Sequence, residues 1–279
     1  MPDLSRSEAD KLLAGIVIPP RPTILTAIME ERAKDEPDLR RIAQLIANDV
    51  ALSAAVLKSI NSPLYGLRRQ IASIDQAVAM LGLKNIGALV LGLSLRGAMP
   101  AAGLDRFWDS AARTALLASH LAHALGSVSR EDAHMFGLFH DCGIPLLIQR
   151  FSDYKETLAK ANASRDMDFT AVEDARHQTN HAVVGSLLAS NWKLPGHFHD
   201  AILHHHDTDV YQSDLPIPTL NLIATVHLAE HIENSYSRLA TDAEWERMGD
   251  KVLAQLMLSG DSLKELTRDC LELLDESGL

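Results

Sequence analysis

The chain has few cysteines, few aromatic residues and a shortage of positive charge. Its 279 residues include two cysteines, and Phe, Trp and Tyr together make up 5%. Two cysteines are too few for the disulfide framework of a small secreted domain. Lys and Arg number 26 against 37 Asp and Glu, which gives a formal net charge of −11 at pH 7. Since binding to nucleic acid or to an anionic membrane needs clustered basic side chains, we expect neither partner.

Long apolar runs are also absent. The longest, residues 86–95, contains glycines and is far shorter than the ~20 residues that span a bilayer. No charged segment with an apolar leader precedes residue 20. We therefore expect a cytoplasmic protein without a transmembrane segment. In that compartment both thiols, Cys142 and Cys270, should be reduced, and each is interpreted as apolar packing.

Apolar residues, which make up 47% of the chain, recur with the spacing of amphipathic helices. No run of alternating β-branched residues is long enough to predict a strand. Asp49 and the sequence Ser73-Ile-Asp-Gln76 have the form of helix N-caps. The fold class is therefore predicted to be all-α. Helices are predicted over residues 21–34, 38–47, 50–60, 73–82, from 85 onward, 107–125, 130–139, 169–190, 196–206, from about 218 to 231, 242–258 and 261–276.

A short segment rich in small residues divides the chain. Residues 97–106 (GAMPAAGLDR) contain proline and two glycines, which favour an interruption between helices. Because the connection is short, the parts on either side should pack against each other. We predict two packed helical subdomains, residues 1–103 and residues 104–279.

All thirteen histidines lie between His120 and His231, and one of them forms the doublet His140-Asp141. Imidazole and carboxylate are ligands that suit divalent cations. The alternative is that most of these histidines are structural or surface groups. His177 and His181 have the spacing of a zinc-protease helix, but Gln178 stands where the catalytic glutamate would be. A Cys142 nucleophile beside His140 lacks an evident orienting partner.

Four blocks follow one another in the first half of the chain. They are Ile18-Pro-Pro-Arg-Pro-Thr23, Leu45-Ile-Ala-Asn-Asp49, Leu57-Lys-Ser-Ile-Asn-Ser-Pro-Leu-Tyr-Gly66 and Ile74-Asp-Gln-Ala-Val-Ala-Met-Leu-Gly82. Together they resemble the HDOD family, bacterial signalling modules related to the HD-domain phosphohydrolases. The resemblance covers about residues 12–237 and implies that the second subdomain is an HD-like helical core. Val50 stands where the family usually has proline, which should affect only a helix start.

The resemblance also implies where catalytic HD proteins would bind metal. Their ligands are a histidine on an early helix, the His-Asp doublet, later histidines and an aspartate on a late helix. The corresponding positions are Ser110, His140, Asp141, His181, His205, His206 and Glu230. Serine is a poor ligand, so six of these seven positions keep a ligand-type side chain. HD-GYP enzymes tend to have a lysine after the glycine of this motif, whereas here no lysine follows Gly143 and Pro145 stands in that stretch. Residues 207–218 contain no Gly-Tyr-Pro turn.

These losses imply a regulatory or binding module of bacterial signal transduction that has no catalytic residues and acts through signalling protein partners. No cofactor is required, although the degenerate site could hold a divalent metal (Fe, Mn, Zn or Mg) and the module could bind a nucleotide. The alternative function is a metal-dependent phosphohydrolase that acts on cyclic di-GMP or another nucleotide through the same six residues. A third interpretation is a helical scaffold without any ligand.

Overall fold

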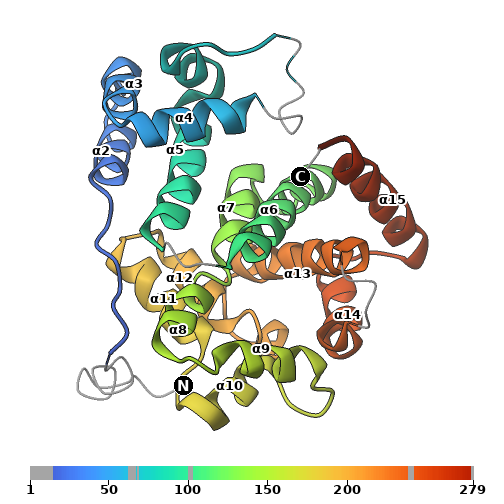
Figure 1. The fold of residues 1–279 in the computed structure, drawn as a ribbon. Coiled ribbons are helices and arrows are strands. Elements are labelled where there is room, and N and C mark those ends of the chain that lie inside the picture. The colour runs from blue at the N-terminus through green and yellow to red at the C-terminus, as the bar shows by residue number, and fades with distance from the viewer. Residues whose placement is uncertain (1–14, 62–66, 68, 100–102, 238–241, 278–279) are drawn as a thin grey trace.

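The computed structural model describes residues 15–61, 67, 69–99, 103–237 and 242–277. Every regular element within these ranges is a helix (Figure 1), so the predicted all-α class is confirmed. The elements are α2 (Thr23–Arg32), α3 (Leu39–Ala47), α4 (Val50–Ile60), α5 (Ile74–Ala98), α6 (Asp105–Leu125), α7 (Arg130–Phe139), α8 (Gly143–Arg150), α9 (Tyr154–Ala163), α10 (Phe169–His177), α11 (His181–Asn191), α12 (Gly196–His204), the 3₁₀ turn η2 (Val210–Gln212), α13 (Ile217–Ser237), α14 (Ala243–Gln255) and α15 (Gly260–Ser277).

The N-terminal group consists of α2, α3 and α4 packed around α5 (Figure 1). The helix starts follow the sequence signals, since the Asp49 carboxylate accepts the Leu52 N–H and the Ser73 hydroxyl accepts the Gln76 N–H. Asn61 ends α4 and bonds across to Ile71, donating to its carbonyl at 2.8 Å and accepting its N–H at 2.7 Å. The end of the block Leu57–Gly66, residues 62–66, lies outside the described residues.

Helix α5 is bent at Gly82, where the sequence predicted a break. Gly82 has φ 70° and ψ 173°, a left-handed conformation that favours glycine. By length and composition α5 alone among the described helices could cross a bilayer, or α3 and α4 as well if their 112° bent pair counts as one segment. Core helices of soluble proteins meet the same criterion, and α5 is in contact with α2, α3, α4 and α7.

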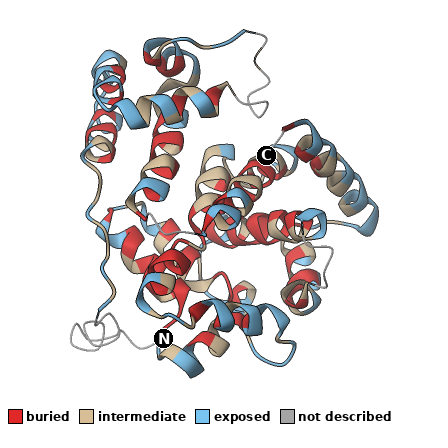
Figure 2. Ribbon diagram, in the orientation of Figure 1, coloured by how far each residue is buried: buried red, intermediate tan, exposed pale blue. Residues whose placement is uncertain are grey.

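The second group is built on α6, α7 and α13, which pack closely against one another. Helices α8, α11 and α12 cover one side, and α14 and α15 lie against α13 on the other (Figure 1). Figure 2 shows that the buried residues lie along the inner faces of these helices. The largest fully buried side chains include Phe136, Phe139 and Trp192, so the core surrounds the end of α7.

Two sequence expectations for this group need correction. Residues 169–190 were expected to form one helix, but the chain turns between α10 and α11. Gln178 adopts φ 58°, and the Asn180 side chain caps a new helix by accepting the Val183 N–H at 2.9 Å. His177 and His181 therefore lie on different helices and do not share one helical face, as a zinc-protease helix would require. Helices α8 and α9 were not foreseen.

The two groups are joined by contacts as well as by the chain. Helix α5 packs on α7, and Gly92 lies so close that an added Cβ would meet the Leu138 side chain at 2.0 Å. Arg21 Nη1 donates to the Trp192 carbonyl at 3.2 Å, and Trp192 Nε1 donates to the Pro19 carbonyl at 2.9 Å. The predicted division at residue 103 falls between α5 and α6, where residues 100–102 lie outside the described ranges.

A buried carboxylate ties α2 to α3. Glu31 accepts hydrogen bonds from Lys34 Nζ at 2.6 Å, from the Asp38 N–H at 2.9 Å and from Arg41 Nη1 at 2.6 Å. The bonds from Lys34 and Asp38, the strongest influences, lower the pKa of Glu31 to about 2 from an ordinary 4.5. Because the folded-state pKa is depressed, this stabilisation is complete above pH 4.5 and is lost as the pH falls toward 2.

We therefore expect Glu31→Gln to lower the denaturant midpoint of unfolding at pH 7, and the difference from wild type to shrink steadily below pH 4.5. Denaturant unfolding at pH 7, 4.5 and 3 measures this. Glu30→Gln is the control, because Glu30 is exposed and lies 3.9 Å from Arg41. A Glu31→Gln effect that is the same at all three pH values would contradict the assignment.

Candidate metal centre

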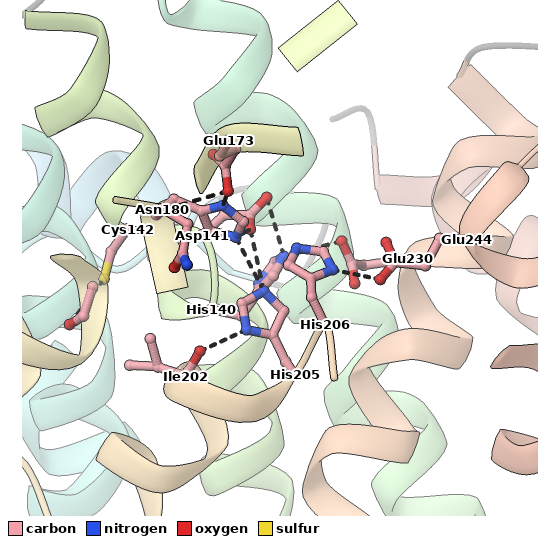
Figure 3. Close-up of polar contacts among 12 residues, drawn as sticks. His140, Asp141, Cys142, Glu173, Asn180, Ile202, His205, His206, Glu230 and Glu244 are labelled. Atoms are coloured by element: carbon pink, nitrogen blue, oxygen red, sulfur yellow. Dashed lines mark hydrogen bonds and ion pairs between the residues drawn. The ribbon is translucent and has the colours of Figure 1, made fainter. Parts of the chain in front are cut away.

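Six side chains from four separate parts of the chain meet where α7, α11, α12 and α13 come together. Figure 3 labels all of them except His181. His140 ends α7, Asp141 follows in the turn before α8, and His181 is the first residue of α11. His205 and His206 come directly after α12, and Glu230 lies on α13. The structure thus brings together all six side chains that the family resemblance implied as metal ligands. That they bind a metal remains a prediction.

A glycine allows this convergence. A Cβ added to Gly143 would lie 2.1 Å from the His181 carbonyl oxygen and 2.9 Å from the Gly185 nitrogen, so only glycine lets α8 approach α11 this closely. That approach sets Asp141 beside His181. Cys142 stands between Asp141 and Gly143 in the turn. It is buried, with Sγ 3.7 Å from the Gly185 carbonyl oxygen, and burial raises the pKa of its thiol. Core packing of Cys142 agrees with this geometry, and a nucleophile does not.

Each of the four histidines is held by its Nδ1 atom. His140 Nδ1 lies 2.9 Å from the Gly137 carbonyl oxygen, and His205 Nδ1 lies 2.7 Å from that of Ile202. His181 and His206 use carboxylates instead. In each case the Nδ1 contact leaves Nε2 as the nitrogen that could bind a metal, the arrangement typical of metal-binding histidines.

The two carboxylates are Glu173 and Glu244. His181 Nδ1 lies 2.7 Å from Glu173 Oε2, and the other oxygen of Glu173 accepts a hydrogen bond from the Tyr154 hydroxyl. Glu244, from the start of α14, accepts from His206 Nδ1. Sequence analysis missed both carboxylates because a glutamate distant in the chain has no local pattern that announces its partner.

The Nε2 atoms of His181 and His205 face the Asp141 carboxylate. Oδ1 of Asp141 lies 3.1 Å from His181 Nε2 and 3.5 Å from His205 Nε2. Together with His206 these residues offer four ligand atoms, all within 4.8 Å of one another. A second set, His140, Asp141 and Glu230, meets the same limit, and His140 Nε2 lies 3.0 Å from Glu230 Oε1.

The donor set fits a divalent metal. Three imidazoles and a carboxylate are a common set for zinc and other borderline cations. Nε2 of His206 is buried and has no hydrogen-bond partner among the described residues, which is unusual for a buried polar atom unless an ion or water meets it. Asp141, His181, His205 and His206 would therefore hold one ion.

Burial and the neighbouring carboxylates shift the pKa values of three histidines in the cluster. Burial lowers the pKa of His140, but the Asp141 and Glu230 carboxylates outweigh it and raise that pKa to about 9. Burial opposes protonation of His181 too, yet Glu173 and Asp141 raise its pKa well above the usual range. Burial lowers the pKa of His206, which stays neutral. A cation held by Asp141, His181, His205 and His206 would displace the proton of His181, since metal ligands must be deprotonated.

Ser110, at the position of the missing histidine, is engaged elsewhere. Its hydroxyl donates to Glu233 Oε2 at 2.9 Å, and Arg113 donates to Glu233 Oε1 from Nε at 2.9 Å and from Nη2 at 2.7 Å. Ser110 and Arg113 are one turn apart on α6, and Glu230 and Glu233 are one turn apart on α13. Beside the set of His140, Asp141 and Glu230 the structure thus has a buried ion pair and a serine in place of a fourth ligand.

A cleft of about 1170 Å³ leads to the cluster. Its lining residues include His140, Asp141, His206 and Glu230, as well as Arg106 and Lys155. The cluster of candidate metal ligands is therefore reachable from outside the protein. His227 is also buried near this cluster, with its ring 6.5 Å from that of His205.

Comparison with known families places the chain. The model of the HDOD domain matches residues 18–208. The chain belongs to the HDOD domain family. The match is narrower than the predicted 12–237: it contains Ser110 and the four ligands from Asp141 to His206, while Glu230 and Glu244 lie beyond it.

Proteins of known sequence or structure are similar to this chain. An uncharacterized protein of Treponema pallidum (strain Nichols) is 29% identical over 212 residues, which are 72% of this chain and 41% of that protein. The chain spans less than half the length of the curated relatives it matches. The crystal structure of a Shewanella amazonensis SB2B protein named as a phosphohydrolase has a TM-score of 0.71 at 21% identity and covers 97% of this chain and 94% of that one.

A Marinobacter aquaeolei VT8 protein named as a signal transduction protein has a TM-score of 0.68 at 22% identity, over 96% of this chain and 60% of that one. At these identities the two structures show the shared fold alone. The second subdomain therefore has the HD-like helical fold that the resemblance predicted.

Proposed function

We propose that this HDOD domain is a non-catalytic regulatory module of signal transduction that holds one divalent metal ion on Asp141, His181, His205 and His206. The observation that supports it most is the difference between the two ligand sets. The set around His206 has four ligands with every Nδ1 anchored. The set around Glu230 has three, because Ser110 is bonded to Glu233.

This difference bears on catalysis. When bound, a metal ion polarises a phosphoryl oxygen and lowers the pKa of its water, and two-metal phosphodiesterases use a pair of ions about 3.5–4 Å apart. One complete set supports one ion. Hydrolysis of a phosphodiester would lack the second. The role of the module is then to present a metal-stabilised surface to a signalling protein partner.

The name of the Marinobacter relative as a signal transduction protein agrees with such a role. The proposal includes a cytoplasmic location, since Cys142 and Cys270 are free buried thiols and suit a reducing compartment.

The second candidate is a metal-dependent phosphohydrolase that acts on cyclic di-GMP or another nucleotide. The size of the cleft and its access to His140, Asp141 and Glu230 favour it. The name of the Shewanella structure points the same way for that protein. A nucleotide could also bind in this cleft without being hydrolysed.

Hydrolysis assays separate the two functions. We expect no multiple turnover of cyclic di-GMP or of a nucleotide panel with added Mn²⁺, Fe²⁺ or Mg²⁺. Ser110→His should raise metal occupancy more than turnover, since an added imidazole supplies a ligand but does not rebuild the substrate contacts. Wild-type turnover within the usual enzymatic range of about 1–10³ s⁻¹, abolished by Asp141→Ala, would establish the phosphohydrolase instead.

A further inference from the structure

We propose that helix α14 is coupled to the metal site through Glu244: a bound metal holds α14 in place, and a docked α14 strengthens metal binding. The inference rests on the proposed metal site and assigns it a regulatory output. Glu244 would act as a positioning residue, because it touches the His206 ring and not the ion.

The geometry around Glu244 supports this assignment. Glu244 lies in the first turn of α14, which Asp242 caps by accepting the Trp245 N–H at 3.0 Å. Its carboxylate accepts from His206 Nδ1, and the opposite nitrogen of that ring, Nε2, is the buried atom without a partner. Phe169 stacks on the same ring with centroids 4.7 Å apart and planes at 6°. The ring is therefore fixed in its plane by Phe169 and in its direction by α14.

The docking of α14 depends largely on polar and stacking contacts near Glu244. Trp245 stacks on His231 with centroids 4.0 Å apart, and Asp242 lies 3.2 Å from His231 Nδ1. Arg247 donates to the Ser164 carbonyl at 2.6 Å. Few large apolar side chains of α14 are buried, mainly Met248 and Val252. Contacts of this kind give α14 a smaller hydrophobic hold than the helices of the core have.

Packing is also incomplete between α13 and α14. A small cavity of about 20 Å³ lies there, lined by His227, Glu230 and Glu244 among others. That is room for about one water molecule. Nε2 of His227 is buried without a hydrogen-bond partner among the described residues. The gap and the unpartnered His227 nitrogen mean that α13 and α14 are not fully packed against each other. Such an interface suits a helix whose docking strength changes with metal occupancy.

The size of the coupling follows from metal chemistry and thermodynamic reciprocity. Loss of a group that orients a ligand histidine weakens metal binding about 10–100-fold. If docking of α14 strengthens metal binding by that factor, metal binding must favour docking of α14 by the same factor. The ligands from Asp141 to His206 lie inside the matched HDOD segment, and α14 lies after it. Metal occupancy is thereby linked to a helix outside that segment.

The test uses the full chain with Zn²⁺ as the probe. Zn²⁺ affinity is measured by competition with a chromophoric chelator for wild type, Glu244→Ala, Glu244→Gln and Glu246→Gln. Glu246 is the matched control on the same helix, where it is exposed and pairs with Arg165 at 3.4 Å. We expect Glu244→Ala to weaken binding about 10–100-fold. Glu244→Gln should recover part of the affinity, since its amide oxygen can still accept from Nδ1, and Glu246→Gln should match wild type.

Hydrogen exchange of residues 243–255 gives a second readout that is independent of affinity. Saturating Zn²⁺ should slow this exchange in wild type and in Glu246→Gln, and much less in Glu244→Ala. Wild-type affinity in Glu244→Ala, or wild-type α14 exchange unchanged by bound Zn²⁺, would overturn the coupling and leave the metal site standing. A wild-type chain that binds no Zn²⁺ would remove the proposed metal site, and the coupling with it.

Discussion

Replacing Asp141 with alanine is expected to abolish metal binding while the helical fold persists. Asp141 belongs to both ligand sets, and its Oδ1 atom lies close to the Nε2 atoms of His181 and His205. Without it the more complete set has three imidazoles and no negative charge that offsets a dication. Loss of a group that only orients a ligand weakens metal binding about 10–100-fold, and the loss of affinity in Asp141→Ala should be larger.

Isothermal titration with Zn²⁺ or Mn²⁺ measures this loss, with far-UV circular dichroism as the check on folding. Asp141→Asn is a second variant that keeps the shape of the side chain and removes its charge, so it separates metal loss from repacking. Asp109→Ala is the control, because Asp109 lines the same cleft outside both ligand sets. Metal binding by Asp141→Asn or Asp141→Ala at wild-type affinity would refute the ligand assignment.

The second large effect concerns the ion pair beside Ser110. Glu233 keeps 2% of its side chain exposed and Arg113 14%, with Nη2 2.7 Å from Oε1. Arg113→Ala leaves the Glu233 carboxylate buried without its cation. Breaking a buried pair from one side destabilises a protein by about 3–5 kcal/mol. We expect a loss of this size in the free energy of unfolding.

Denaturant unfolding checks the value. The double variant Arg113→Met with Glu233→Gln should recover much of the loss, since no buried charge then lacks a partner. Arg96→Ala is a matched surface control: Arg96 and Asp105 are 3.5 Å apart and both largely exposed, and such pairs contribute about 0–1 kcal/mol. An effect of Arg113→Ala as small as that of Arg96→Ala would show that the pair is not a structural element of the cleft.

The sequence was sufficient for features that depend on neighbouring residues. Asp49 and Ser73 start helices where their side chains can accept backbone N–H groups, and Gly82 interrupts α5 where a left-handed residue is needed. The resemblance supplied the distant positions from Ser110 to Glu230. The described structure brings the six ligand-type side chains together, although 90 residues separate His140 from Glu230.

Other features depend on partners that no local pattern reveals. Glu173, Glu233 and Glu244 look like ordinary helical surface residues in the sequence, yet each accepts hydrogen bonds from a group in or beside the metal cluster. The break at Gln178 was missed although no apolar residue stands between Ala175 and Ala182. The capping residue Asn180, followed by His181, was the available signal. Helix α8 was missed because Pro145 lies inside it, in the first turn, where proline is tolerated.

The most direct test of the account is the metal content of the protein, purified without a histidine tag and measured by elemental analysis after exposure to excess Zn²⁺, Mn²⁺ or Fe²⁺ and removal of the unbound ion. The account predicts one tightly held ion per chain, lost in Asp141→Ala and unaffected in Asp109→Ala. Two ions per chain together with turnover of a nucleotide, or no retained ion in the wild-type protein, would contradict it.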